Sequence, residues 1–289
     1  MIQSNKQHTL KSKISFKGVG LHTGETCTMT IVPTKGNHGY KFQRTDLEGE
    51  PIIDACTKNV CSTLRSTSLG KDGAKVHTTE HILAALYASG VDNALIQLNS
   101  LEVPILDGSS GMFTQSIEKS GTKELEEDRL FFKVNKNISY INKERGVEML
   151  IVPLEEDELR LTVMLEYNSP ILGTQHARLE NLSEFSKEIA SCRTFVFMKE
   201  VKSLAEKGLI KGGDVDNAVV LAEKPYSKAE LQDIAKSLGR DELGIVEGET
   251  GVVSTSKLRF VNEPARHKLL DILGDLALIG RYIHGHVLT

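Results

Sequence analysis

The spacing of apolar and polar positions predicts a long amphipathic helix near the C-terminus. Apolar residues recur every three or four positions between residues 263 and 279, opposite a polar face, which is the pattern of a helix of about four turns. Pro264 suits the first turn, Asn262 precedes it as a cap, and Gly280 marks its end. On this helix His267 and Asp271 are i, i+4 neighbours, so their side chains share one face.

A second helix is predicted from residue 80 to Ser89-Gly90, capped by Thr78 or Thr79, with Glu80 and His81 in its first turn. Other segments alternate in the manner of strands or show shorter helical periods. Strands are predicted within 8–33 (two, around a glycine-rich turn), 94–99, 130–135, 147–153, 159–166 and 218–221, and a strand end with a turn at 103–109. Helices are predicted near 111–120, 183–190, 199–207 and 228–238.

Each half of the chain thus places groups of strands before a helix, which predicts an α+β fold of two similar sheet-plus-helix-layer domains with a possible origin in duplication. The charged stretch 119–128 is predicted to be a linker, so that residues 1–124 form the first domain and 125–289 the second. Residues 222–256 are rich in charge and lack a long apolar period, so we expect an insertion or exposed loop there.

Composition narrows the class of protein. The 289 residues, 39% hydrophobic and 26% charged, suffice for two domains. A net charge of -4, no block of Lys and Arg and no Trp argue against a nucleic-acid partner. Because no uncharged apolar run reaches about 18 residues, we expect no integral membrane segment and a cytoplasmic location. The four cysteines form no CxxC pair, which disfavours a disulfide framework or a cysteine-type zinc site.

Candidate chemistry lies on the two helices. His267 and Asp271 can share a metal ion if a third ligand comes from elsewhere, and His81 can supply it while Glu80 acts as a base. The alternatives stay open: a solvated i, i+4 contact on one helix, and on the other a glutamate that favours the helix dipole beside a packed histidine. No long helix follows the glycine-rich turn at His22, so a dinucleotide loop is disfavoured and His22 is explained as a turn residue.

Several motifs together resemble UDP-3-O-acyl-N-acetylglucosamine deacetylases, the zinc enzymes of lipid A biosynthesis in Gram-negative bacteria. In chain order they are Gly18-Val19-Gly20-Leu21-His22-Thr23-Gly24, Thr79-Glu80-His81, Ile105-Leu106-Asp107-Gly108-Ser109, Arg193-Thr194-Phe195, Lys211-Gly212-Gly213 with Asp216-Asn217-Ala218, and His267-Lys268-Leu269-Leu270-Asp271 with Gly274-Asp275. The resemblance covers nearly the whole chain. The insertion at 222–256 resembles the form of this enzyme that is fused to a (3R)-hydroxyacyl carrier-protein dehydratase domain, which is therefore an expected partner.

The resemblance implies an active site between the two domains, where the N-acetyl group of UDP-3-O-(3-hydroxyacyl)-N-acetylglucosamine is hydrolysed. It implies that Zn²⁺, or alternatively Fe²⁺, is held by His81, His267 and Asp271. The catalytic residues that it implies are Glu80 as base, Thr194 as hydroxyl donor to the developing oxyanion, and Asp275 as the carboxylate that orients a general-acid histidine. The substrate contacts that it implies are Lys268, Phe195, His22, Val201, Ile210 and Val215, with ordinary core packing as the alternative for the apolar residues of the 196–215 region.

The chain departs from the family at one point. The Gly-His pair that supplies the general acid should fall just beyond Thr289, and His284 and His286 lie on the predicted last strand instead. We therefore expect a C-terminally shortened form of a longer protein, with its last domain incomplete. Two alternatives to an active deacetylase follow: a form that binds metal and ligand but is catalytically impaired without that histidine, and a structural-metal or metal-free scaffold.

Overall fold

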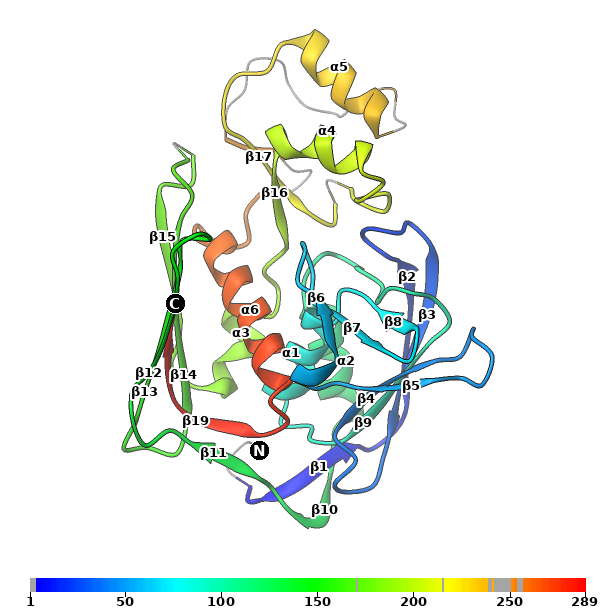
Figure 1. Cartoon of the computed structure of the whole chain (residues 1–289), viewed down its shortest axis with the longest axis vertical. Coiled ribbons are helices and arrows are strands. Elements are labelled where there is room, and N and C mark those ends of the chain that lie inside the picture. Colours follow the sequence, from blue (N-terminus) through cyan, green and yellow to red (C-terminus); the bar gives the residue numbers. More distant parts are fainter. Residues whose placement is uncertain (1–3, 170, 215, 239–240, 242–250, 254–256) are drawn as a thin grey trace.

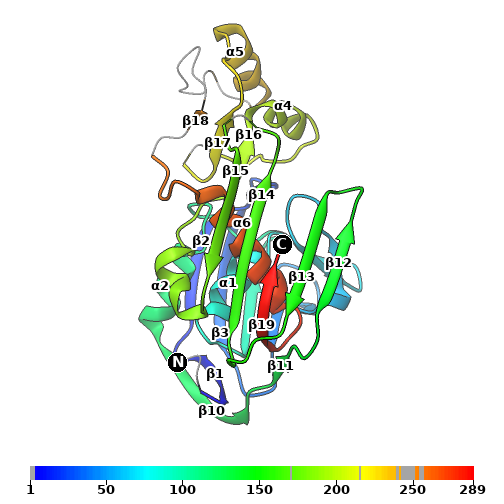
Figure 2. The same ribbon diagram turned by 90° about the vertical axis from the view of Figure 1, so that its left-hand side faces the viewer.

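The computed structural model describes residues 4–169, 171–214, 216–238, 241, 251–253 and 257–289. Two sheets form the outer layers, and the helices α1, α2, α3 and α6 lie between them (Figures 1 and 2). These helices are α1 Glu80–Ala88, α2 Gly111–Ser120, α3 Phe185–Glu188 and α6 Glu263–Ala277. The arrangement confirms the predicted α+β class, with one continuous apolar core between the sheets.

The two sheets have the same topology. The first has the strand order β2-β3-β9-β4-β5. The second has the corresponding order β12-β13-β19-β14-β15, and a sixth strand, β11 Phe131–Lys133, pairs with β19 off this path. In each, the central strand comes last in the chain, runs antiparallel to one neighbour and parallel to the other, and follows a long helix. The strands of the first sheet are β2 Ile14–Val19, β3 Thr26–Pro33, β4 Tyr40–Arg44, β5 Ile52–Asp54 and β9 Ala94–Leu98. Those of the second are β12 Ile138–Asn142, β13 Val147–Val152, β14 Leu159–Glu166, β15 Thr174–Leu179 and β19 Tyr282–Leu288.

A small insertion precedes the long helix in each half. In the first half it is a three-stranded sheet of β6 Val60–Ser62, β7 Ser68–Lys71 and β8 Ala74–Val76. In the second half it comprises β16 Phe195–Phe197, α4 Met198–Glu206, β17 Val219–Ala222, α5 Lys228–Ser237 and β18 Gly251–Val253. The helix expected at 228–238 is confirmed, but the description of 222–256 as an exposed loop is wrong in part, because Leu231 and Ile234 of α5 pack against Val201 of α4 in a core of their own.

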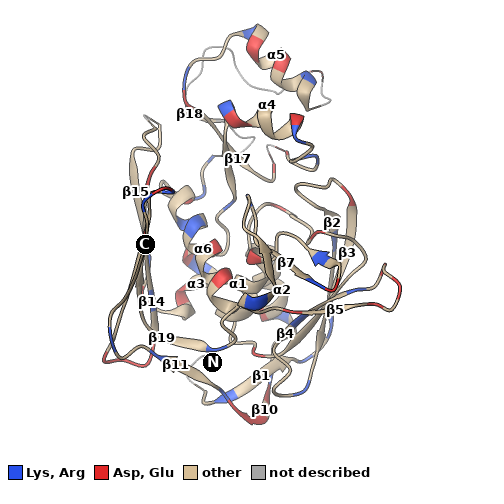
Figure 3. Cartoon of the chain, viewed as in Figure 1, with Lys and Arg blue, Asp and Glu red and all other residues tan. Residues whose placement is uncertain are grey.

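The stretch 119–128 is not a linker. It contains the end of α2 and then β10 Thr122–Asp128, which pairs antiparallel with β1 Lys6–Leu10. Most side chains of β10 face solvent, and Figure 3 shows the acidic residues gathered on it. Its composition therefore reads as a linker although its backbone is hydrogen-bonded in a strand. The division into domains at residue 124 stays a prediction.

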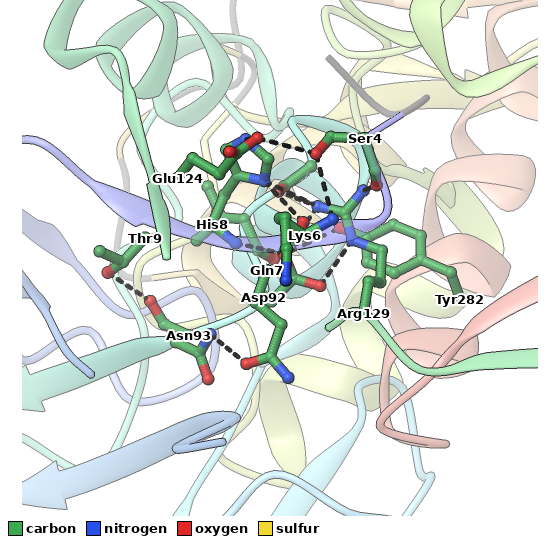
Figure 4. Close-up of polar contacts among 12 residues, drawn as sticks. Ser4, Lys6, Gln7, His8, Thr9, Asp92, Asn93, Glu124, Arg129 and Tyr282 are labelled. Carbon is green, nitrogen blue, oxygen red and sulfur yellow. Dashed lines mark hydrogen bonds and ion pairs between the residues drawn. The ribbon is translucent and has the colours of Figure 1, made fainter. Parts of the chain in front are cut away.

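Arg129 joins this ribbon to both halves of the chain, through a buried ion pair with the first half and a cation–π contact with the second sheet (Figure 4). Arg129, which follows β10, has a fully buried side chain and forms two bonds with Asp92, Nη2–Oδ2 at 2.6 Å and Nε–Oδ1 at 2.8 Å. Its guanidinium carbon lies 4.4 Å from the ring centroid of Tyr282 in β19. The next strand, β11 Phe131–Lys133, pairs parallel with β19. The junction between the two halves is thus fixed by charge as well as by backbone pairing.

The strand end and turn expected at 103–109 are confirmed: Pro104 forms an isolated bridge with Gly20, and residues 106–107 form a turn. A proline has no N–H group to donate to a ladder, so the pairing does not extend. Within the described residues, none of the helices has the length and apolar character needed to cross a bilayer.

Candidate metal centre

The crossing of α1 and α6 brings the predicted ligands together. His81 lies in the first turn of α1, and His267 and Asp271 lie one turn apart on α6. The Asp271 Oδ1 atom is 3.3 Å from His267 Nε2 and 3.7 Å from His81 Nε2, and the three ligand atoms all lie within 4.8 Å of one another. The two imidazole rings are nearly perpendicular, with centroids 5.0 Å apart. Both histidines are buried, whereas Asp271 is one-fifth exposed.

The helices can approach closely because Gly274 has no side chain. A Cβ atom at this position would lie 2.8 Å from the carbonyl carbon and 2.9 Å from the Cα atom of Glu80, and closer still to its carbonyl oxygen. The backbone of α6 therefore rests directly on the first turn of α1, one turn beyond Asp271. This explains why a glycine stands in the middle of a helix where alanine would have the better intrinsic propensity.

A second buried ion pair fixes the start of α6. The guanidinium of Arg193 is fully buried, and its Nε lies 3.0 Å from Oε1 of the equally buried Glu263. The backbone N–H of Arg193 donates to the same oxygen at 2.9 Å. The preceding carbonyl, that of Cys192, lies 2.9 Å from Nδ1 of His267. This contact orients the ring with Nε2 toward Asp271, as is usual for a histidine ligand.

The donor set fits a divalent cation. Asp271 Oδ1 is buried and has no hydrogen-bond partner among the described residues, although it faces two imidazole nitrogens. A buried carboxylate oxygen without a partner is costly unless a cation or a donor occupies the space before it. Two imidazoles and one carboxylate are a ligand set typical of Zn²⁺ and Fe²⁺ sites that keep an open position. The arrangement could therefore hold a metal ion.

The protonation states of the three candidate ligands also favour the binding of a metal ion. Burial lowers the pKa of both histidines, that of His81 to about 3, so both imidazoles are neutral near pH 7. Burial alone would raise the pKa of Asp271, but the neighbouring His267, Lys268 and His81 outweigh it and hold the value at about 2. All three ligands are thus deprotonated without competition from protons at neutral pH.

Two further carboxylates border the centre. Burial and the charge of Asp271 raise the pKa of Glu80 well above its usual range. Burial also raises the pKa of Asp275, one turn beyond Asp271 on α6, to about 6. Both carboxylates contact Thr67, Glu80 through the backbone N–H at 3.0 Å and Asp275 through the hydroxyl at 2.6 Å. A carboxylate with a raised pKa beside a metal site is suited to accept and return a proton.

An apolar cavity opens beside the centre. Its volume is about 100 Å³, and its lining includes five of the residues predicted to contact substrate or oxyanion: His22, Thr194, Phe195, Val201 and Ile210. Lys268 lies between cavity and centre, with Nζ 2.9 Å from Asp271 Oδ2 and 5.6 Å from the Phe195 ring centroid. Val215 lies outside the described residues.

The imidazole ring of His22 lies in this lining. Both of its ring nitrogens are buried and lack a hydrogen-bond partner within the part of the chain that the structure describes. Burial lowers the pKa of the ring, which is therefore neutral at pH 7. The nearby backbone is held by Glu102, a fully buried carboxylate that accepts hydrogen bonds from the N–H groups of His22 and Thr23 and from the Thr78 hydroxyl at 2.7 Å.

Sequence reasoning missed several residues of the site. Glu102 carries no local signal, because a single glutamate after a strand is ordinarily a surface residue. Thr67 carries no local signal either, because a single threonine in a short loop is ordinarily a solvated turn residue. The expected caps are correct in position but not in contact: Thr79 directly precedes α1, yet its hydroxyl donates to the Thr67 carbonyl at 3.0 Å and makes no cap. His284 and His286 lie on β19, as expected.

The comparison with known proteins decides the family. The model of the family described as UDP-3-O-acyl N-acetylglycosamine deacetylase matches residues 7–235 and 232–289. The chain belongs to this deacetylase family. Among curated members, the UDP-3-O-acyl-N-acetylglucosamine deacetylase of Geotalea uraniireducens is 36% identical over 282 residues, which are 97% of this chain and 82% of that protein.

Other family members are longer. The protein named bifunctional enzyme LpxC/FabZ from Chlorobaculum tepidum is 44% identical over 284 residues, 98% of this chain and 60% of its own length. The protein of the same name from Porphyromonas gingivalis is also 44% identical, with 61% of its length covered. The chain thus spans about three-fifths of the length of these relatives.

Proposed function

We propose that this protein is a zinc-dependent hydrolase that removes the N-acetyl group from UDP-3-O-(3-hydroxyacyl)-N-acetylglucosamine in lipid A biosynthesis. The observation that carries the proposal is the unpartnered, buried Asp271 Oδ1 facing two neutral imidazoles, next to Glu80. Membership of the deacetylase family supports the reaction and the substrate class.

His81, His267 and Asp271 would hold the ion. When bound, Zn²⁺ supplies the acidity that turns a water into a nucleophile near pH 7 and polarises the amide carbonyl. The chain's own residues supply the rest. Glu80, whose pKa is raised, would accept the proton of the attacking water at its carboxylate.

Thr194 would stabilise the negative charge that develops on the amide oxygen. Its backbone is fixed from both sides, because its N–H donates to the Gly108 carbonyl at 2.8 Å and its carbonyl accepts from the Val219 N–H at 2.8 Å. The hydroxyl is thereby carried on a rigid segment of the cavity wall. A preorganised donor of this kind is worth roughly 3 kcal/mol of transition-state stabilisation.

The remaining residues would bind the substrate. The Lys268 ammonium would act as a fixed cation at the junction of centre and cavity. Phe195 would flank the sugar, and Val201 and Ile210 would line the passage for the acyl chain. His22 would give its unpartnered ring nitrogens to a polar group of the substrate.

The test is acetate release from UDP-3-O-(3-hydroxyacyl)-N-acetylglucosamine by the zinc-loaded protein, beside a Glu80→Ala variant and beside UDP-N-acetylglucosamine as an unacylated substrate. We expect release that the substitution abolishes and that the unacylated compound does not support. A protein that binds zinc and substrate without releasing acetate would refute the proposal. Metal analysis of protein purified without added metal distinguishes Zn²⁺ from Fe²⁺.

We also propose a dehydratase partner and a compartment. The relatives named LpxC/FabZ support a (3R)-hydroxyacyl carrier-protein dehydratase as the fused or associated partner of this deacetylase. The nucleotide-sugar substrate supports the cytoplasm as the site of reaction. An immunoblot of cell extract, fractionated into cytoplasm and membranes, would measure both the native mass and the location.

A further inference from the structure

The loop between β6 and β7, residues 63–67, connects the two sides of the site. At its tip Arg65 lies in the left-handed region, with φ of 66°, and pairs with Glu200 of α4 at 2.7 Å. At its end Thr67 is buried between α1 and α6, with 6% of its surface exposed. One short segment therefore contacts the insertion of the second half and both helices of the metal centre.

The polar groups of Thr67 are all engaged, and each contact reaches one of the two helices. Its N–H donates to Oε2 of Glu80 at 3.0 Å, and its hydroxyl donates to Oδ1 of Asp275 at 2.6 Å. Its carbonyl accepts from the N–H of Thr79 at 3.1 Å and from the Thr79 hydroxyl at 3.0 Å. A single residue thus holds the carboxylate at the start of α1, the carboxylate on α6 and the backbone at the beginning of α1.

These contacts restrict groups that would otherwise rotate. A glutamate side chain has three rotatable bonds and an aspartate has two, and a donor on one oxygen selects the orientation of the other. Hydrogen bonds to charged acceptors are about twice as strong as neutral ones, so they are effective in fixing a rotamer. With Oε2 of Glu80 engaged by Thr67, Oε1 is the oxygen left without this contact.

We propose that Thr67 is a positioning residue for the deacetylation: its backbone orients Glu80, its hydroxyl orients Asp275, and the two carboxylates keep a fixed relation to each other across the α1–α6 crossing. This inference rests on the proposed function, because its main test measures the turnover of the proposed deacetylation. It adds to that function a residue that is neither one of the three candidate ligands nor part of the lining of the apolar cavity. The hydroxyl is the part that substitution can remove, because the N–H belongs to the backbone.

The experiment compares Thr67→Val, which replaces only the hydroxyl with a methyl group, with Thr67→Ser, which retains it. The control is Thr63→Val, the same chemical change at an exposed position of the same loop. We expect Thr67→Val to lower kcat roughly 10- to 100-fold, with KM and zinc content unchanged, because misplaced supporting groups cost rates of this order. Thr67→Ser should stay within about threefold of the unmodified protein on the same grounds, and Thr63→Val should match it.

A merely structural role would give a different pattern, in which Thr67→Val lowers the free energy of unfolding and the zinc content while kcat per bound zinc stays constant. That result would overturn the inference, as would a Thr67→Ser variant as slow as Thr67→Val. The double variant Thr67→Val with Asp275→Asn supplies a further check. If the hydroxyl acts through Asp275, the double variant should be no slower than Asp275→Asn alone, whereas multiplying losses would contradict it.

The failure of the proposed function is distinguishable from the failure of this inference. Unmodified protein that releases no acetate refutes the proposed function alone. The coupling between Thr67→Val and Asp275→Asn can still be measured in the free energy of unfolding, where non-additive effects support the positioning contact and additive effects overturn it.

Discussion

Replacing Gly274 with alanine tests whether the α1–α6 crossing sets the geometry of the metal centre. The new Cβ would overlap the backbone of Glu80, with 2.8 Å to its carbonyl carbon against the 3.5–4.0 Å that carbon atoms prefer. Both partners are main chain, so no side-chain rotation relieves the contact. The helices must separate, and with them His81 on one side and His267 and Asp271 on the other.

The size of the effect follows from this overlap. Relief requires a displacement of roughly 1 Å, whereas metal–ligand distances tolerate about 0.2 Å. Overpacking of a core costs about 1–3 kcal/mol, and disturbance of the groups that support a metal site weakens binding roughly 10- to 100-fold. In a helix without such a contact, the same change would stabilise by about 1 kcal/mol. A loss of stability in Gly274→Ala would therefore show that the close contact between α6 and α1 outweighs the better helix propensity of alanine.

The assay is chemical unfolding of the metal-free protein together with zinc affinity by chelator competition. Gly111→Ala in α2 is the matched control, because a Cβ there would meet no backbone atom nearer than 3.5 Å and only the Ser109 hydroxyl at 3.2 Å. We expect Gly274→Ala to lower both stability and affinity. Gly111→Ala should leave the affinity unchanged and should raise the stability by up to about 1 kcal/mol. A Gly274→Ala protein that is more stable and binds zinc as tightly as before would refute the reasoning.

Three other predictions follow from the contacts described. His81→Ala should lose stoichiometric zinc, as measured by metal analysis after dialysis, while circular dichroism shows an intact fold; retained zinc would exclude this histidine as a ligand. The contribution of Asp275 to the stability of the metal-free protein should fall as the pH rises from about 4 to about 6, because burial raises the pKa of Asp275 from 3.8 to about 6 and the unfolded chain favours the ionised form. The buried histidines, whose pKa values are lowered, contribute a slope of the opposite sign over this range. Chemical unfolding at several pH values should show that the stability of the unmodified protein, relative to that of Asp275→Asn, falls over this range. A difference that does not change with pH would contradict this assignment to Asp275. Arg129→Met should lower the free energy of unfolding by about 3 kcal/mol, since it leaves the largely buried Asp92 carboxylate without its charged partner, although the His8 N–H still donates to it at 2.7 Å. Lys6→Met, which removes an exposed ion pair, is the control and should have no measurable effect.

The features of the site that depend on local helical periodicity could be predicted from the sequence. The i, i+4 spacing of His267 and Asp271 and the position of His81 at a helix start follow from helical geometry alone. Which helices cross could not be derived in this way, because the crossing depends on contacts between residues almost 200 positions apart. The ligand set needed the resemblance to a known family, and the structure then brought the three residues together.

Residues that act through burial were beyond local reasoning. Glu102 and Thr67 are polar residues in unremarkable surroundings, and their roles arise only when the chain closes around them. β10 was misread as a linker for the opposite reason, since its side chains are exposed and only its backbone is paired. In both cases the residue type indicates whether a side chain prefers water or the interior, but it does not indicate which partner the side chain or backbone meets in the fold.

The central place of β19 has a consequence for biosynthesis. Residues 282–288 pair with β11, β13 and β14, which are made about 120 to 150 residues earlier. During translation, the edges of β13 and β14 that later pair with β19 therefore stay unpaired while the insertion of the second half and α6 are synthesised. The first sheet closes much sooner, because its central strand is β9. The nascent chain should thus pass through a state with one finished sheet and one open one, in which the exposed edges depend on chaperones for protection from aggregation.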